Sequence, residues 1–286
     1  MIKKSISTPI RIWLRDAAEQ LAEVGISSAL LDAEIILSHT LRKSRTWLHA
    51  HSEELVSARE LEIANARLDL RLDRTPIAYI IGHKEFYGRL FKVTPAVLIP
   101  RPESETIITL LTGVCDGSPK QLLDIGTGSG CLGITAKLEH PELEVILVDI
   151  SQHALTIAEK NAESLGASVK IVRNNLLTTN PQLPANIDIV VANLPYVDRS
   201  WERSVETNAE PDIALFANKK GLALIERVLV EAASYLQDQL HILLEADPRQ
   251  HESIIRHATA LGYHHLASEG FCLVFRLTRS VDTREI

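Results

Sequence analysis

Apolar residues recur every three or four positions through the first 75 residues, which is the spacing of one face of an α-helix. Three segments carry this pattern, over residues 11–26, 28–41 and 57–74. Gly25 suits the end of the first helix, and Ser28 suits the N-cap of the second. The apolar positions of the predicted faces are Ile12, Leu14, Ala18, Leu21 and Val24, then Leu31, Ile35 and Leu41, then Leu61, Ala64, Leu68 and Leu72. We therefore predict a small all-α helical bundle, which forms the first domain (residues 1–75).

Residues 76–102 carry a different pattern, rich in β-branched and aromatic side chains, with Gly82 and Gly88 as turn points. A Thr-Pro pair breaks the preceding helix, because the residue before a proline disfavours helical backbone. This segment is predicted to be a β-hairpin linker. Near its end, Arg101 and Glu105 can either order a substrate loop or bridge the two domains.

Short apolar runs alternate with helical segments through the rest of the chain. The predicted strands cover residues 121–125, 144–150, 168–172, 187–196, 239–245, 264–268 and 271–277. Apolar strands that alternate with helices indicate a parallel sheet covered on both faces, and the last two runs suggest an antiparallel edge. The predicted fold class is α/β, with a Rossmann-like seven-stranded domain over residues 103–286.

The acidic charge lies in this second part of the chain. The first 75 residues carry 11 basic and 11 acidic side chains and the remainder carries 19 and 26, which accounts for the net charge of −7. Phosphate neutralisation needs clustered Lys and Arg, so direct binding to nucleic acid is not expected. No apolar run approaches the roughly 18 residues of a membrane span, and no secretory signal is apparent. We expect a cytoplasmic protein without a membrane partner.

The three cysteines, Cys115, Cys131 and Cys272, lie far apart and show no C-x-x-C spacing. This arrangement indicates neither a disulfide framework nor a zinc site. Buried, reduced thiols are the simpler interpretation, and no metal ligand is predicted.

A glycine-rich loop, DIGTGSG over residues 124–130, follows the first predicted strand. Glycines let the backbone turn sharply and approach a ligand closely, and such a turn between a strand and a helix forms a nucleotide-binding crevice. Gly133 completes a formal dinucleotide fingerprint, but the denser D-x-G-x-G-x-G form is that of S-adenosylmethionine binders. The alternative is a loop that only turns tightly. The candidate cofactor-binding residues here are Gly126, Thr127, Gly128, Ser129 and Gly130.

Polar residues also follow the next two predicted strands. Asp149 ends the second strand, where a carboxylate can accept hydrogen bonds from both ribose hydroxyls. The alternative is a solvated strand end or a helix cap, since Ser151 follows. After the third strand, Asn174 and Asn175 can contact the adenine base or form a plain turn.

The fourth predicted strand ends in Asn193-Leu194-Pro195-Tyr196, at the same edge of the sheet as the glycine loop. An Asn side-chain carbonyl and the next backbone carbonyl can together accept both hydrogens of one NH₂ group. Accepting both favours a pyramidal nitrogen whose lone pair points at a methyl donor, which a planar amide nitrogen needs. Tyr196 offers an aromatic face and Pro195 stiffens the turn. The alternative is an ordinary strand-ending turn.

Taken together, these motifs resemble the peptide chain release factor glutamine methyltransferases, the HemK-type enzymes, over nearly the whole chain. The matching segments, in order, are residues 31–37, 76–82, 85–87, 98–103, 124–130, 149, 193–196, 210–211 and 214–215. The combination is specific to the family, whereas the single pieces are not.

The resemblance implies a class I methyltransferase domain that uses S-adenosyl-L-methionine. The methyl group would go to the side-chain amide of the Gln in the Gly-Gly-Gln motif of a peptide chain release factor, the protein partner. The family pattern places the methionine part of the cofactor on residues 126–130 and the ribose on Asp149. Asn175 and Asn193 are further candidate cofactor-binding residues, although Asn175-Leu176 stands where the family often has an acidic or aromatic pair. The Gln amide would sit on Asn193 and the Leu194 carbonyl, against Tyr196, while the amino-terminal bundle engages the release factor.

Leu194 departs from the family pattern, which is normally N-P-P-Y. A Leu carbonyl can still accept a hydrogen bond, so we expect weaker preorganisation and an unchanged reaction. Because N-L-P-Y is typical of ribosomal RNA adenine dimethyltransferases, a nucleic-acid adenine N6-type methyltransferase is the main alternative. There are two further alternatives. One is a glutamine methyltransferase that acts on a ribosomal protein, and the other is a non-catalytic cofactor-binding protein. Ser104 in place of the usual Thr is a milder departure.

Overall fold

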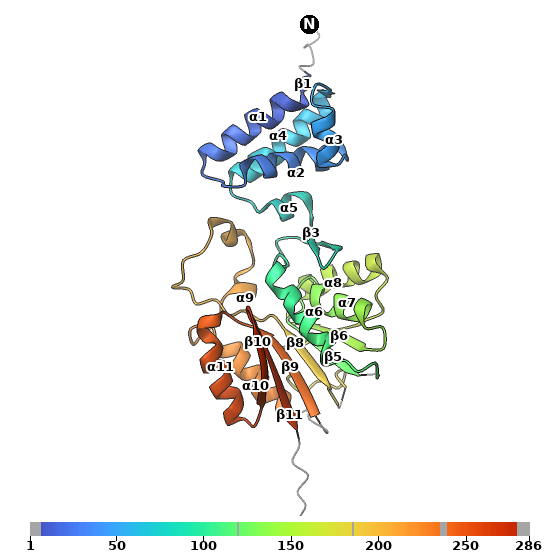
Figure 1. Cartoon of the computed structure of the whole chain (residues 1–286), viewed down its shortest axis with the longest axis vertical. Coiled ribbons are helices and arrows are strands. Elements are labelled where there is room, and N and C mark those ends of the chain that lie inside the picture. Colours follow the sequence, from blue (N-terminus) through green and yellow to red (C-terminus); the bar gives the residue numbers. More distant parts are fainter. Residues whose placement is uncertain (1–6, 119, 185, 235–238, 279–286) are drawn as a thin grey trace, which may run out of the picture. The chain divides into compact units, whose positions relative to one another are not determined.

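The chain forms two compact units (Figure 1). The computed structural model describes residues 7–118, 120–184, 186–234 and 239–278. The first unit comprises Met1–Gly82 and Ser204–Ala209, and the second comprises His83–Arg203 and Glu210–Ile286. The first unit therefore extends seven residues past the predicted boundary at residue 75 and includes a segment from much later in the chain.

The first unit is a helical bundle, as predicted. Its main elements are β1 (Thr8–Pro9), α1 (Ile10–Glu23), α2 (Ala29–Leu41), α3 (Arg45–Ala50), β2 (Leu55–Val56), α4 (Ala58–Leu72) and α5 (Ile77–Ile81). The short helix α3 and the antiparallel pairing of β1 with β2 were not predicted. Both escape a periodicity analysis because α3 has six residues and each strand has two.

The faces that the helices bury differ in part from the prediction. In α2, Leu31 was predicted to be a core residue but is 42% exposed, whereas Asp32 and Glu34 are buried. Each buried acid is paired, since Arg71 Nε donates to Asp32 at 2.7 Å and Arg45 Nε donates to Glu34 at 2.8 Å. Charged side chains can face inward only when they are paired, and helical spacing cannot reveal such partners. The buried face of α1 is also shifted, and consists of Ile10, Trp13, Leu14, Ala17 and Leu21.

The predicted linker contains both a helix and a hairpin. The prediction of a β-hairpin is wrong for α5, which begins after Pro76 and ends at Gly82 in the left-handed region, with φ 78°. The hairpin itself is confirmed over β3 (His83–Phe86) and β4 (Arg89–Lys92). The buried side chain of Asn161 contacts both the hairpin and the segment after β5. Its Oδ1 accepts from Lys92 N at 2.7 Å, and its Nδ2 donates to Ser129 O at 2.8 Å. The hairpin is thereby linked to the glycine loop.

The second unit contains the predicted seven-stranded, mostly parallel sheet. Its strands are β5 (Gln121–Ile125), β6 (Glu144–Asp149), β7 (Lys170–Arg173), β8 (Ile189–Ala192), β9 (Gln239–Glu245), β10 (His264–Glu269) and β11 (Cys272–Thr278). The spatial order is β10-β11-β9-β8-β5-β6-β7, and β11 runs antiparallel to both of its neighbours. The predicted antiparallel pair is confirmed, with β11 inserted between β9 and the edge strand β10.

Helices cover both faces of this sheet, and alternate strand residues supply the two cores. One core packs against α10 (Ala223–Ala233) and α11 (Pro248–Ala260). The other core packs against α6 (Glu105–Thr112), α7 (Cys131–Glu139) and α8 (Gln152–Leu165). The strand order reverses between β5 and β8, and such a switch point opens a crevice at the carboxyl ends of the strands. Among the described helices, none has the length and apolar character that crossing a bilayer would require.

Candidate active site

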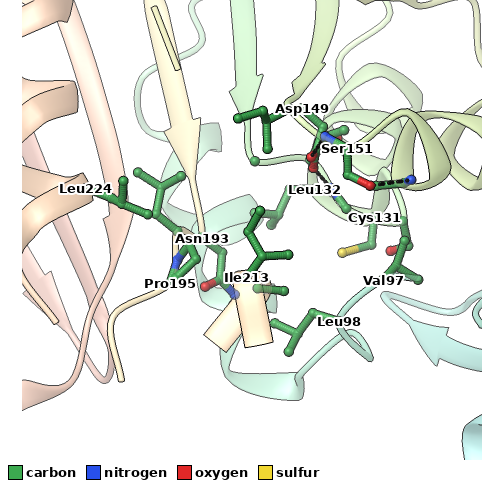
Figure 2. A pocket seen from close by; sticks show the side chains of 18 of the residues that line it. Val97, Leu98, Cys131, Leu132, Asp149, Ser151, Asn193, Pro195, Ile213 and Leu224 are labelled. Atoms are coloured by element: carbon green, nitrogen blue, oxygen red, sulfur yellow. Dashed lines mark hydrogen bonds between the residues drawn. The ribbon is translucent and has the colours of Figure 1, made fainter. Parts of the chain in front are cut away.

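A cavity lies at this switch point, within the second unit (Figure 2). The predicted site residues that line it are Gly126, Thr127, Gly128, Ser129, Asp149, Asn175, Asn193, Leu194 and Pro195. Two other predicted residues, Gly130 and Tyr196, are not in the lining. Apolar side chains such as Val97, Leu98 and Ile213 complete the wall. The structure thus brings predicted site residues from four separate chain segments to one crevice.

The glycine loop has the backbone geometry that the motif predicts. Gly126 and Gly130 adopt left-handed φ values of 71° and 83°. A Cβ on Gly130 would lie 2.6 Å from Ile134 Cδ1, so a side chain there would collide with the first turn of α7. The amides of Gly126 and Thr127 both donate to Val148 O, at 2.8 and 3.0 Å. These bonds hold the loop against the end of β6.

The carboxylate of Asp149, at the end of β6, accepts hydrogen bonds from the glycine loop and from the start of the next helix. One oxygen accepts from Gly128 N at 3.0 Å and the other accepts from Ser151 N at 2.8 Å. Ser151, not Asp149, is the N-cap of α8, since its Oγ accepts from Ala154 N at 3.2 Å. Burial raises the pKa of Asp149, while the amide hydrogen bonds oppose that rise. The two carboxylate oxygens together offer about four acceptor sites and receive backbone amides from Ser151, Gly128 and Ile150, so acceptor capacity remains for a ligand hydroxyl.

A second buried carboxylate, Asp124, stands beneath the loop. Its Oδ2 accepts from Thr127 Oγ1 at 2.6 Å and from Gly133 N at 2.9 Å. Its Oδ1 has no hydrogen-bond partner among the residues that the structure describes. Burial raises the pKa of Asp124 to about 6, although these hydrogen bonds act in the opposite direction.

This raised pKa predicts a pH-dependent stability. A carboxyl whose pKa is about 6 when folded and near 3.9 when unfolded stabilises the fold most below the lower value. That contribution, about 3 kcal/mol, is lost as pH rises through 6. Asp124→Asn keeps an acceptor oxygen for Thr127 and Gly133 but carries no charge. Between pH 4 and 7, the free energy of unfolding measured by chemical denaturation should fall further in wild type than in Asp124→Asn, by an amount approaching this contribution. If the free energies of unfolding of the two proteins change with pH in parallel, the assignment is wrong.

A chain of hydrogen bonds fixes the side chain of Asn193. Its Nδ2 donates to Ser104 Oγ at 3.0 Å, and Ser104 Oγ donates to Glu245 Oε2. The other oxygen of Glu245 accepts from Tyr196 OH at 3.0 Å. The single hydroxyl hydrogen of Ser104 goes to Glu245, so Ser104 can only accept from Asn193. This directs the Asn193 amide nitrogen toward Ser104 and leaves Oδ1, for which the described residues provide no partner, as the free acceptor.

Sequence reasoning did not include Glu245 in the site. This residue is 2% exposed and ends β9, the strand next to β8. Its position at the carboxyl end of a parallel strand is the one signal that could have pointed to the crevice. Burial raises the pKa of Glu245, and burial together with the nearby Glu245 raises the pKa of Tyr196. The Tyr196 hydroxyl therefore stays protonated and acts as a hydrogen-bond donor.

Arg101 and Glu105 both make contacts within the second unit. Arg101 pairs with the buried carboxylate of Glu210, which also accepts from Ile99 N at 3.1 Å. Glu105 accepts from Tyr87 N at 2.8 Å. Because Arg101 also lines the cavity, these contacts order a loop beside the site. They favour that alternative over a bridge between the domains.

Leu194 packs directly against the glycine loop. Its side chain is buried, and its Cδ2 lies 2.9 Å from where a Cβ on Gly126 would be. A side chain at position 126 would therefore collide with Leu194, so glycine is required there, whereas a proline at position 194 would act by restricting φ. Weaker preorganisation by Leu194 stays a prediction.

The seven-stranded sheet, the glycine loop and Asp149 define a class I S-adenosylmethionine-dependent methyltransferase. The residues suit this ligand: a glycine loop in which Gly126 and Gly130 have no room for a side chain, a buried carboxylate and an apolar wall. Two family models match the chain, the PrmC N-terminal domain over residues 13–82 and the methyltransferase small domain over residues 105–209.

Curated relatives specify the family further. The release factor glutamine methyltransferase of Aliivibrio fischeri is 31% identical over 266 residues, covering 92% of this chain and 94% of the relative. That of Koribacter versatilis is 35% identical over 241 residues, covering 81% and 86%. The chain therefore belongs to the release factor glutamine methyltransferase family and is an S-adenosylmethionine-dependent protein glutamine methyltransferase. These relatives do not favour the nucleic-acid alternative.

Other relatives are longer or share only the fold. The bifunctional methyltransferase of Rickettsia felis is 31% identical over 288 residues, which cover 89% of this chain but 54% of the relative. A methyltransferase structure from Pyrococcus furiosus matches 75% of this chain and 96% of its own, with 17% identity and a TM-score of 0.50. The hMettl16 catalytic domain, in complex with MAT2A 3'UTR hairpin 6, matches 80% and 86%, with 14% identity and a TM-score of 0.51. At such identities the structures show a common fold alone.

Proposed function

We propose that this enzyme methylates the side-chain amide nitrogen of the Gln in the Gly-Gly-Gln motif of a peptide chain release factor. The observation that carries the proposal is the orientation of Asn193, whose amide nitrogen is held by Ser104 while its Oδ1 stays free at the cavity. A primary amide has two N–H donors. Asn193 Oδ1 and the Leu194 carbonyl can accept one each.

The roles of the remaining residues follow from this arrangement. When bound, S-adenosylmethionine supplies an electrophilic methyl group. The loop residues 126–130 hold its methionine part, Asp149 accepts its ribose hydroxyls, and Asn175 lies at the adenine. Tyr196 and Pro195 restrict the plane of the substrate amide. Positioning of this kind can supply roughly 7–11 kcal/mol of a barrier.

The first unit is the proposed docking region for the release factor. Its later segment, η2 (Val205–Ala209), comes soon after Tyr196 in the chain and is held by ion pairs. Glu206 Oε1 lies 3.2 Å from both Arg71 Nη2 and Arg74 Nη1. A substrate that contacts this unit would therefore contact a segment joined directly to the Asn193 loop. A cytoplasmic location fits such a partner.

A methyl-transfer assay with labelled S-adenosylmethionine tests the proposal. The substrates are a purified release factor, the same factor with its Gly-Gly-Gln glutamine changed to Ala, and ribosomal RNA. We expect label on the intact factor only. Equal label on the altered factor, or label on RNA, would overturn the proposed substrate.

Ser104 is predicted to act as a positioning residue for Asn193. Ser104→Ala removes the acceptor for Asn193 Nδ2 and leaves Glu245 with one donor fewer. We expect kcat to fall about 10- to 100-fold, in line with the loss of one or two hydrogen bonds, with little change in the KM for the cofactor. Ser104→Thr is the matched control, because it keeps the hydroxyl and should keep near wild-type kcat. Equal losses in both variants would show that packing, not the hydrogen bond, matters at this position.

A further inference from the structure

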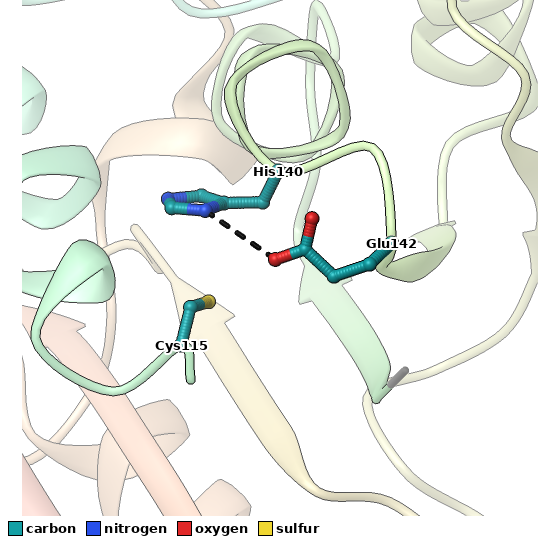
Figure 3. A group of neighbouring side chains, drawn as sticks. All are labelled: Cys115, His140 and Glu142. Atoms are coloured by element: carbon teal, nitrogen blue, oxygen red, sulfur yellow. Dashed lines mark ion pairs between the residues drawn. The ribbon is translucent and has the colours of Figure 1, made fainter. Parts of the chain in front are cut away.

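Three side chains from two loops lie close together before the amino ends of β5 and β6 (Figure 3). The active-site cavity lies at the other end of the sheet, where the strands have their carboxyl ends. Cys115 follows α6, while His140 and Glu142 lie between α7 and β6. Their Sγ, ring nitrogen and carboxylate oxygen all lie within 4.8 Å of one another. All three side chains are partly buried. The expectation of no zinc site rested on cysteine spacing, which cannot reveal a group assembled from separate loops.

Thr112 holds the far ring nitrogen of His140, so that the near nitrogen faces the cluster. His140 Nε2 lies 3.3 Å from Thr112 Oγ1, and that hydroxyl donates to Ile108 O. The other ring nitrogen, Nδ1, faces Glu142. A neighbouring group that fixes the far nitrogen in this way is typical of metal-bound histidines.

The facing atoms have the spacing of metal ligands. Nδ1 of His140 lies 3.7 Å from Glu142 Oε1, which is too long for a hydrogen bond. Two tetrahedral zinc ligands with bonds of about 2.0–2.3 Å are separated by about 3.3–3.6 Å. The two groups form an ion pair when the ring is protonated, and a metal ion bound between the two atoms would replace that proton. The neighbouring Asp116 is paired with Lys120 at 3.1 Å, so the lysine already has a carboxylate partner.

We propose that Cys115, His140 and Glu142 bind a zinc ion, with water in the fourth position. A thiolate, an imidazole and a carboxylate form a donor set that suits Zn²⁺. The thiolate and the carboxylate together neutralise the ion. The bound metal would join the end of α6 to the turn that precedes β6, and so stabilise the second unit. It lies away from the glycine loop and takes no part in methyl transfer.

Cobalt binding to the full chain, stripped of metal by a chelator, tests this site. Co²⁺ reports thiolate ligation by its charge-transfer absorption, and added Zn²⁺ should displace it. We expect one equivalent of Co²⁺ per wild-type chain. Cys115→Ser should abolish the charge-transfer band, and Glu142→Gln should weaken Zn²⁺ binding about 100-fold. Thermal unfolding should shift upward with Zn²⁺ in wild type, shift less in Glu142→Gln at the same Zn²⁺ concentration, and not shift in Cys115→Ser.

Matched controls separate this site from surface binding. His153→Ala removes an exposed histidine outside the cluster, and Cys131→Ala removes a thiol at the cavity. Both should keep the wild-type cobalt spectrum. Absence of a saturable thiolate band in wild type, or its survival in Cys115→Ser, would overturn the proposal. Circular dichroism of each variant confirms that lost binding does not reflect unfolding.

Discussion

Asn193→Ala should lower kcat for methyl transfer by about 1,000-fold, the upper range for loss of one preorganised hydrogen-bonding group. The substitution removes Oδ1, which we propose as an acceptor for the substrate amide. One amide hydrogen would then have no partner in the site, and the nitrogen would be free to stay planar. The Leu194 carbonyl alone cannot direct the nitrogen lone pair, because it holds only one of the two hydrogens.

Two measurements together test this assignment. Single-turnover kinetics with release factor report the chemical step, and calorimetric titration with S-adenosylmethionine reports cofactor affinity. We expect the affinity to change little, because loop residues 126–130 and Asp149 do not depend on Asn193 for their hydrogen bonds. Parallel loss of affinity and turnover would instead place Asn193 in the cofactor site alone.

Asp149→Ala should weaken S-adenosylmethionine binding by about 100-fold or more. Hydrogen bonds to a charged acceptor contribute about 1.5–3 kcal/mol each, and the ribose offers two hydroxyls. The same substitution removes the acceptor for Gly128 N, which lies 3.0 Å from Asp149 Oδ2, so the glycine loop loses a constraint as well. Both effects act on the binding of the cofactor before any methyl transfer.

The kinetic signature of this variant differs from that of Asn193→Ala. Turnover of Asp149→Ala should recover substantially at saturating S-adenosylmethionine, whereas that of Asn193→Ala should not. Asp149→Asn is a matched control, because it keeps one acceptor oxygen and should bind with an affinity between wild type and Asp149→Ala. Unchanged cofactor affinity in Asp149→Ala would refute the ribose assignment.

Much of the catalytic unit could be predicted from residue order. Strands β5, β6, β8 and β9 are short apolar runs bounded by polar residues. Gly126 and Asn193 directly follow β5 and β8, and Asp149 ends β6. In a parallel sheet the carboxyl ends of the strands share one edge. Local sequence therefore predicts that these residues share a common crevice.

Other features depend on partners that are distant in the chain. The inward-facing Asp32 on α2 requires Arg71, 39 residues away. The orientation of Asn193 requires Ser104, 89 residues away, which in turn binds Glu245, 141 residues away. A periodic pattern records whether a side chain is apolar. It does not record which distant group will satisfy a polar one.

The sequence by itself determined the α/β class, the order of the strands along the chain and the positions of the glycine loop, Asp149 and Asn193 at strand ends, because these depend on local hydrophobic spacing and on the turn chemistry of glycine, Asn and Pro. Only the tertiary structure decided which face of α2 is buried, which way the Asn193 amide points and which residues surround Cys115. Those outcomes depend on hydrogen bonds and ion pairs between remote segments, and such contacts exist only once the chain has folded.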